Sequence, residues 1–190
     1  MASHTPVIFA DMMALIHRRF PMHRHFQMFA DYNRWANALV YEACASLSDE
    51  EYRADKGAFF GSAHRTLNHL LTADRIWLKR MTGSGTAPEA LDAILFDDFV
   101  ALREAREAED RRLIDWVGTL TEEQLAQPFS YSPISNPTVI TQPLGPVLSH
   151  VFNHQTHHRG QVHMILTSLG KPSLILDLIY FLRAEGRQWT

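Results

Sequence analysis

Histidines are concentrated in one stretch of the chain, residues 148–166, which contains five of the eleven and no proline. Imidazole nitrogens bind divalent transition metals near neutral pH. If the stretch is a helix, each residue turns by about 100°, so His154 and His158 lie about 40° apart on the side that carries Val151 and Val162. His163 points the opposite way. His150 and His157 fall on one shoulder of the apolar side. The spacing therefore predicts an inward-facing His-x-x-x-His pair in the middle of the apolar stripe.

Two explanations compete for such a pair. Burying a neutral imidazole without a partner costs about 1–3 kcal/mol, so each ring needs either a metal or a hydrogen-bonded backbone or carboxylate group. A bare His-x-x-x-His is a weak pattern, and this one lacks the glutamate of the metalloprotease helix. For two inward histidines four residues apart in a helical bundle, we favour the metal.

A useful metal site needs a third ligand from another helix. The segment 62–81 offers His69, His64 and Asp74. Helical rotation places His69 and His64 on opposite flanks of that segment's apolar face and does not choose between them. Asp74 lies nearer the centre, where it could instead pair with an arginine or histidine inside the bundle.

The elements that must position these residues are amphipathic helices. Apolar residues recur every three or four positions over about 22–47, 62–81, 97–120 and 146–169. The third segment is so polar between Arg103 and Arg112 that we expect a wide solvated face. Short β-type runs at 129–131 and 138–141 predict a hairpin, Ser48 and Glu51 match a capping box, and 174–185 predicts a last short helix. The fold class is therefore all-α: a four-helix bundle with a small β-hairpin before the fourth helix and a short C-terminal helix.

Length and composition fit one domain. We assign residues 22–190 to the bundle and residues 1–21 to an N-terminal extension, in which Pro6 and Pro21 bracket a weakly patterned short helix over residues 7–20. The net charge of −3 without basic clusters argues against nucleic-acid binding. No apolar run approaches the roughly 20 residues of a membrane span, and no signal-peptide pattern is seen. The single cysteine, Cys44, fits a reducing compartment, so we expect a cytoplasmic protein without membrane or nucleic-acid partners.

Three segments carry a resemblance to a known family. Asn153-His-Gln-Thr-His-His-Arg-Gly-Gln161 resembles the signature of the DinB/YfiT-like metal-binding four-helix bundles, and residues 66–78 and 29–37 resemble that family's second and first helices. The resemblance covers about residues 26–169. It implies a three-histidine metal site whose ligands fall on His69, His154 and His158, and so it selects His69 where spacing did not.

The family also implies a class of chemistry. Its members of known activity resemble metal-dependent transferases that use low-molecular-weight thiols, such as bacillithiol S-transferases and mycothiol-dependent maleylpyruvate isomerases. We therefore expect a divalent ion (zinc or nickel first, iron or manganese as alternatives), a small-molecule substrate, a thiol cofactor and a homodimer. The alternatives are a non-catalytic metal-binding stress or sensor protein, and a metal-activated hydrolase. Catalytic and cofactor-binding residues remain unassigned.

Several residues near the histidines have two alternative roles each. Asp74, His150, His157 and Gln161 are candidates to orient the metal ligands, or else ordinary packing and surface residues. Arg159 would meet an anionic substrate or form a solvated or intersubunit salt bridge. A pocket lined by Trp35, Trp77 and tyrosines beside the metal would favour an enzyme, whereas a closed site with a fourth ligand would favour a structural role.

Overall fold

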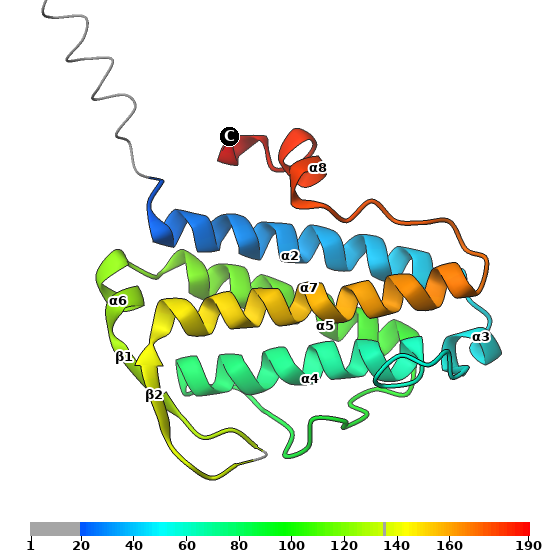
Figure 1. Cartoon of the computed structure of the whole chain (residues 1–190), viewed down its shortest axis with the longest axis horizontal. Coiled ribbons are helices and arrows are strands. Elements are labelled where there is room, and N and C mark those ends of the chain that lie inside the picture. Colours follow the sequence, from blue (N-terminus) through cyan, green and yellow to red (C-terminus); the bar gives the residue numbers. More distant parts are fainter. Residues whose placement is uncertain (1–19, 135) are drawn as a thin grey trace, which may run out of the picture.

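Four long helices form the body of the protein in a computed structural model that describes residues 20–134 and 136–190 (Figure 1). They are α2 (Met22–Cys44), α4 (Ala63–Thr82), α5 (Phe99–Gly118) and α7 (Leu144–Ser168). Helix α2 packs against α5 and α7, and α4 packs against the same two helices. The four therefore form a closed ring in which the α4–α7 seam lies opposite the α2–α5 seam. The predicted four-helix bundle is confirmed.

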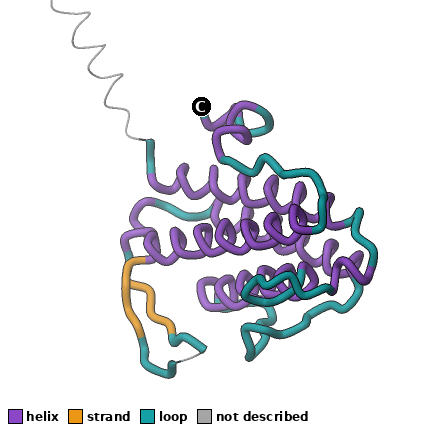
Figure 2. Tube along the Cα trace, turned by 45° about the vertical axis from the view of Figure 1, so that its right-hand side comes forward, coloured by secondary structure: helices purple, strands orange, loops and turns teal. Residues whose placement is uncertain are grey.

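Shorter elements complete the fold, and Figure 2 shows the hairpin at the end of the bundle where α7 begins. They are α3 (Asp49–Arg53), α6 (Glu122–Ala126), β1 (Pro128–Tyr131), β2 (Ile140–Pro143), α8 (Leu178–Arg183) and the 3-10 turn η1 (Arg187–Trp189). Strands β1 and β2 pair antiparallel, with Phe129 opposite Gln142. Within the described residues, no helix is long and apolar enough to cross a membrane.

Local sequence explains the ends of two helices, α3 and α4. The predicted capping box forms at α3, where the Ser48 hydroxyl accepts from the backbone of Glu51 and the Glu51 carboxylate accepts from the backbone of Ser48. Helix α4 begins after Ser62, whose hydroxyl accepts a bond from Arg65 N–H, and ends at Gly83 with φ 70°. That left-handed conformation costs glycine little.

The last predicted helix was too long at its start, because α8 begins at Leu178 rather than near residue 174. Residues before it are held in extended form: Leu174 N–H donates to His163 Nε2, and the Tyr32 hydroxyl donates to the Leu176 carbonyl. Helix α6 was missed, although Thr121 and Gln124 form a capping box of their own.

The prediction of a wide solvated face on the third helix is wrong for the middle of that helix. Arg106, Glu109 and Asp110 of α5 are buried together with Leu102 and Leu113. Arg106 forms ion pairs of 2.7 Å with Asp74 and 3.0 Å with Asp110, so a charged layer crosses the middle of the bundle. Periodicity counts only apolar side chains, and it therefore misses a face whose buried residues neutralise one another.

Candidate metal centre

Three histidines converge on the α4–α7 seam. One imidazole nitrogen from each of His69, His154 and His158 lies within 4.8 Å of the others. The Nε2 atoms of His69 and His154 are 3.3 Å apart. Two nitrogens bound to one tetrahedral ion at 2.0–2.1 Å would be separated by about 3.4 Å, so this spacing fits a shared metal.

The neighbourhood of each ring fixes its orientation. His69 Nδ1 is 2.7 Å from the carbonyl oxygen of Leu91, and His158 Nδ1 is 2.8 Å from Gln161 Oε1. Since each acceptor faces an N–H at Nδ1, the lone pair of Nε2 is left free for an ion. Gln161 was among the candidates for this role.

The loop between α4 and α5 holds the Leu91 carbonyl in place. The Asn68 carboxamide accepts from the backbone of Leu95 and Phe96 and donates to the Phe96 carbonyl. On the other side, the ring of Phe60 stacks on His69 with centroids 3.9 Å apart. Phe60 precedes Gly61, whose φ of 79° turns the chain into α4.

Sequence reasoning did not find Phe60 or Leu91. Phe60 lies in a loop without periodicity, and Leu91 contributes only its backbone carbonyl, which leaves no trace in residue type.

Burial keeps the three rings neutral at pH 7. Burial, together with the smaller effect of the neighbouring histidines, lowers the pKa of His154 to about 3. Burial lowers the pKa of His158 to about 4, against the opposing hydrogen bond from Gln161. The pKa of His69 is lowered by the same cause. Neutral imidazole is the form that binds a metal, so the donor set fits a divalent ion without first losing protons.

The position of the pair on α7 differs from the prediction. His158 is buried, but His154 is only half-buried and lies on the flank of the core-facing side. The centre of that side is occupied by Gln155 and Arg159, both buried. The helical wheel followed apolar residues and did not place Gln155 or Arg159, and each of these is satisfied by polar partners from other helices.

Arg159 has neither of its expected roles. Its guanidinium donates to Asn33 and, at 3.2 Å, to Asn37, both on α2, and it lies over the ring of Tyr32. It therefore packs inside the bundle. Trp35 is also away from the cluster, in an aromatic group with Phe181.

The two other candidates for the third metal ligand, Asp74 and His64, have partners elsewhere. Asp74 accepts a 2.5 Å bond from Gln155 and pairs with Arg106, as its alternative reading anticipated. His64 is buried against Tyr52 and lies 3.5 Å from an Asp97 oxygen. Neither residue is part of the three-histidine cluster.

The remaining α7 histidines lie outside the cluster. His163 Nε2 contacts the Ser173 hydroxyl, and His157 is exposed, with Nε2 3.3 Å from Gln161 Nε2. His150 is exposed, with its ring 5.8 Å from that of His154 and 5.3 Å from Trp77.

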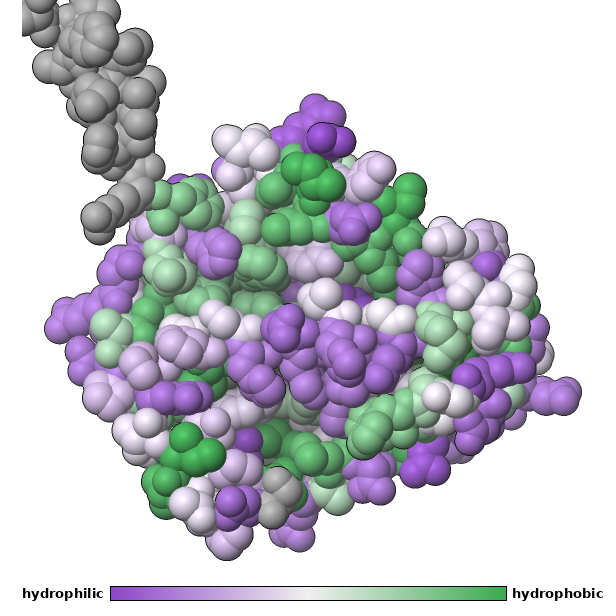
Figure 3. All heavy atoms as spheres, viewed as in Figure 1, coloured by the Kyte–Doolittle hydropathy of each residue, from purple (hydrophilic) through white to green (hydrophobic). Residues whose placement is uncertain are grey.

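The cluster is partly exposed at His154. In residues 20–134 and 136–190, no fourth His, Cys, Asp or Glu joins the three. Figure 3 shows hydrophilic residues gathered over α7 along the middle of the face it displays. A tetrahedral ion held by three nitrogen ligands has one further coordination position, which water or a substrate can occupy.

Comparison with known proteins agrees with this architecture. The sequence model of the DinB family matches residues 22–189. Protein DinB of Bacillus subtilis (strain 168) is 29% identical over 158 residues, which covers 77% of this chain and 87% of the relative. The bundle, its hairpin and the histidine cluster all lie within the matched residues, and the chain belongs to the DinB family.

Proposed function

We propose that His69, His154 and His158 bind one divalent metal ion, and that the protein is a metal-dependent transferase acting with a low-molecular-weight thiol. The observation that carries the proposal is the convergence of three neutral imidazoles within 4.8 Å, with one of them half-buried. Zinc and nickel suit an all-nitrogen donor set best, and iron and manganese are the alternatives.

The bound ion would act as a Lewis acid that lowers the pKa of a thiol or water in its open position. The protein's own residues would hold the site around it. The Leu91 carbonyl and Gln161 orient two of the rings, and Phe60 excludes water from one face of His69. Each of these contacts reduces the reorganisation that binding requires.

The thiol has to come from a second molecule. Cys44 is buried, and burial raises the pKa of its thiol to about 12, so it is neither accessible nor ionised near pH 7. The exposed rim beside His154 carries His150 and Trp77, and Tyr131 of the hairpin lies 4.9 Å from Trp77. These rings offer an apolar surface for a small electrophilic substrate.

Metal analysis and single variants test the metal site. We expect about one divalent ion per chain, lost in His158→Ala and His154→Ala and retained in His163→Ala, because His163 binds Ser173 instead. Metal-free protein that takes up none of zinc, nickel, iron and manganese would refute the site, and equal loss in all three variants would refute its location.

Activity is tested by a transfer screen with several thiols and electrophiles, with and without metal. Metal-dependent consumption of thiol, absent in His158→Ala, is the expected result. If a metal-loaded protein transfers no thiol, a non-catalytic stress or sensor protein is supported. Metal-dependent hydrolysis in the same assays would instead support a hydrolase.

A further inference from the structure

One arginine at the far end of the α4–α7 seam has no carboxylate partner in the part of the chain that the structure describes. Arg80 lies in the last turn of α4, about three turns after His69 and on the same side of the helix. Its guanidinium lies over the ring of Trp77, 4.8 Å from the centroid. Trp77 is about 12 Å beyond His69 along the helix axis, so the charge lies about that far from the first metal ligand.

Aromatic rings connect Arg80 with the histidine cluster. The Trp77 ring is 5.3 Å from that of His150, which in turn is 5.8 Å from that of His154. Tyr131 of the hairpin packs edge-on against Trp77 at 4.9 Å, and its centroid is 5.7 Å from the guanidinium carbon of Arg80. His150 is exposed and Trp77 is half-buried, so a molecule at the metal can extend along these rings to Arg80.

The guanidinium of Arg80 keeps donors available for a ligand. Nη2 donates to the Ser132 carbonyl at 2.7 Å, whereas Nε and Nη1 form no hydrogen bond with any described residue and remain open to solvent. The aromatic rings cover the face of the group, and its N–H bonds lie in its plane, so the rings do not block these donors. Burial lowers the pKa of Arg80, and among the described residues only the Tyr131 phenol opposes that shift. No neighbouring carboxylate therefore balances this half-buried charge.

The elements around this end of the seam carry little negative charge. Residues 124–176, which include the hairpin and α7, contain no Asp or Glu. The single acidic residue of α4 is Asp74, which is buried inside the bundle. The loop after α4 carries Glu89 and Asp92, but it contacts His69 at Nδ1, the ring edge away from the nitrogen that would bind the metal.

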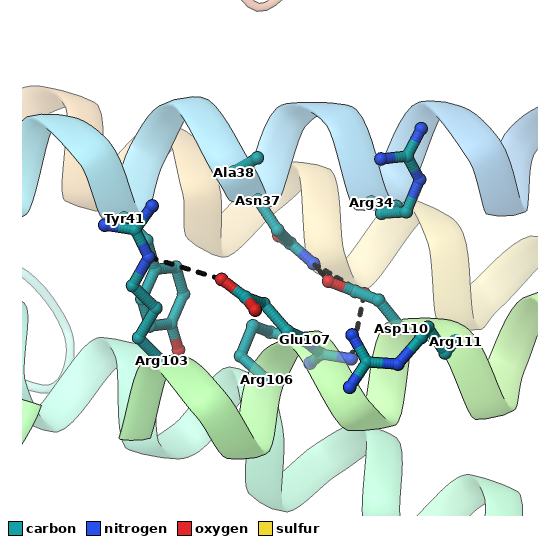
Figure 4. A pocket seen from close by; sticks show the side chains of 9 residues that line it. All are labelled: Arg34, Asn37, Ala38, Tyr41, Arg103, Arg106, Glu107, Asp110 and Arg111. Atoms are coloured by element: carbon teal, nitrogen blue, oxygen red, sulfur yellow. Dashed lines mark hydrogen bonds and ion pairs between the residues drawn. The ribbon is translucent and has the colours of Figure 1, made fainter. Parts of the chain in front are cut away.

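Arginines on the opposite seam differ in this respect. Between α2 and α5, Arg103 pairs with Glu107 at 3.3 Å, and Arg106 pairs with Asp110 at 3.0 Å (Figure 4). On the α4–α7 seam, three neutral imidazoles bring no negative charge to a divalent ion. Both ends of that seam are therefore positive once the metal is bound, and an anionic ligand would balance them.

We propose that Arg80 is a specificity-determining residue of the metal site, and that it binds the carboxylate of an elongated substrate whose reacting group reaches the metal. The proposal rests on the function proposed above. A guanidinium donates charge-assisted hydrogen bonds to a carboxylate, which are about twice as strong as neutral ones. The helix geometry places the carboxylate about 12 Å from the reacting group, with the rings of Trp77 and His150 between them. The carboxylate belongs to the thiol or to the electrophile. No bond is made or broken at Arg80.

Two indole probes test the anion site in metal-free protein, where no metal competes for the carboxylate. Indoleacetate and the neutral indoleacetamide share the ring that would lie on Trp77 and differ in charge. NMR titration at low ionic strength measures both affinities. We expect indoleacetate to bind about tenfold more tightly, and the ratio to fall to about one in Arg80→Gln.

Two further variants control for charge and for folding. Lys79→Gln makes the same charge change at the adjacent exposed position, turned by about 100° on α4, and should keep the ratio. Arg80→Lys keeps the charge but loses the planar donors, and should retain a ratio of about three. Equal binding of the two probes, a ratio that survives in Arg80→Gln, or an equal loss in Lys79→Gln would overturn the proposal.

Thiols of two lengths, titrated into zinc-loaded protein, show which reactant carries the carboxylate. Mercaptoundecanoate can reach from the metal to Arg80, whereas mercaptopropionate is too short. If the carboxylate belongs to the thiol, Arg80→Gln should weaken mercaptoundecanoate about tenfold and leave mercaptopropionate and mercaptoundecanol unchanged. If the thiols bind and none is weakened, an indole ratio that depends on Arg80 assigns the carboxylate to the electrophile. If no thiol binds, the thiol function fails, and the same indole ratio still supports the anion site.

Discussion

At the scale of single residues, the histidine cluster depends on neighbours that fix how each ring is turned. Gln161 lies one turn after His158 on α7 and contacts its Nδ1 at 2.8 Å. We predict that Gln161→Ala weakens metal binding about tenfold, because a ring without this partner must be ordered when the metal binds. Competition with a chelator measures the affinity. Gln127→Ala, at an exposed position at the end of α6, is the matched control and should bind like the unchanged protein.

The same residues predict how stability varies with pH. An unfolded imidazole titrates near pH 6.5, whereas burial lowers the folded pKa of His154 to about 3 and of His158 to about 4. Between about pH 6.5 and pH 4 the unfolded chain therefore binds more protons. The free energy of unfolding of the protein should therefore decrease as the pH is lowered through this range, by at most about 1.4 kcal/mol per pH unit for each histidine.

Urea unfolding of the metal-free protein across this range measures the slope. A double variant, His154→Gln with His158→Gln, should show a shallower slope because both titrating groups are gone. The same slope in both proteins would show that other groups control the acid response.

At the scale of the elements, the most unusual feature is that every long helix contributes a polar side chain to the core. Asn37 comes from α2, Asp74 from α4, Arg106 and Asp110 from α5, and Gln155 from α7. Burial raises the pKa of Asp74 and of Asp110, while Arg106 opposes the shift in both. The arginine is thus the charge that compensates the two buried carboxyl groups.

We predict that Arg106→Met lowers the free energy of unfolding by about 3–5 kcal/mol at pH 7, since it leaves two buried carboxylates unpaired. Part of the loss should be recovered at lower pH, because a carboxyl whose folded pKa is raised binds protons more readily when folded. Arg103→Met removes partly exposed pairs with Glu42 and Glu107 and should cost less than about 1 kcal/mol. Similar losses in both variants would contradict a special role for the buried layer.

At the scale of the whole molecule, the domain boundary and the subunit number remain predictions. The family match begins at residue 22, and residues 1–19 of the expected N-terminal extension lie outside the described part of the chain. We predict that deleting residues 2–19 changes the free energy of unfolding by less than about 0.5 kcal/mol and leaves metal uptake intact. Light scattering on both proteins should give the mass of a homodimer. If the truncated protein does not fold, the domain begins before residue 22. A monomeric mass would refute the dimer.

The sequence by itself determined the four helices, the hairpin and the spacing of His154 and His158, because apolar periodicity and capping are local properties. With the family resemblance it also selected His69. It could not determine which side of α7 faces the core. Gln155 and Arg159 are polar, so apolar periodicity does not place them in the core, where Asp74, Asn33 and Asn37 from other helices satisfy them.

The tertiary structure alone decided the rest. It buried the charged centre of α5, and it placed the Leu91 carbonyl and Phe60 around His69. In each case the cause is a contact between residues far apart in the chain. A polar group can be buried only where such a contact satisfies it, and no local pattern records whether it does.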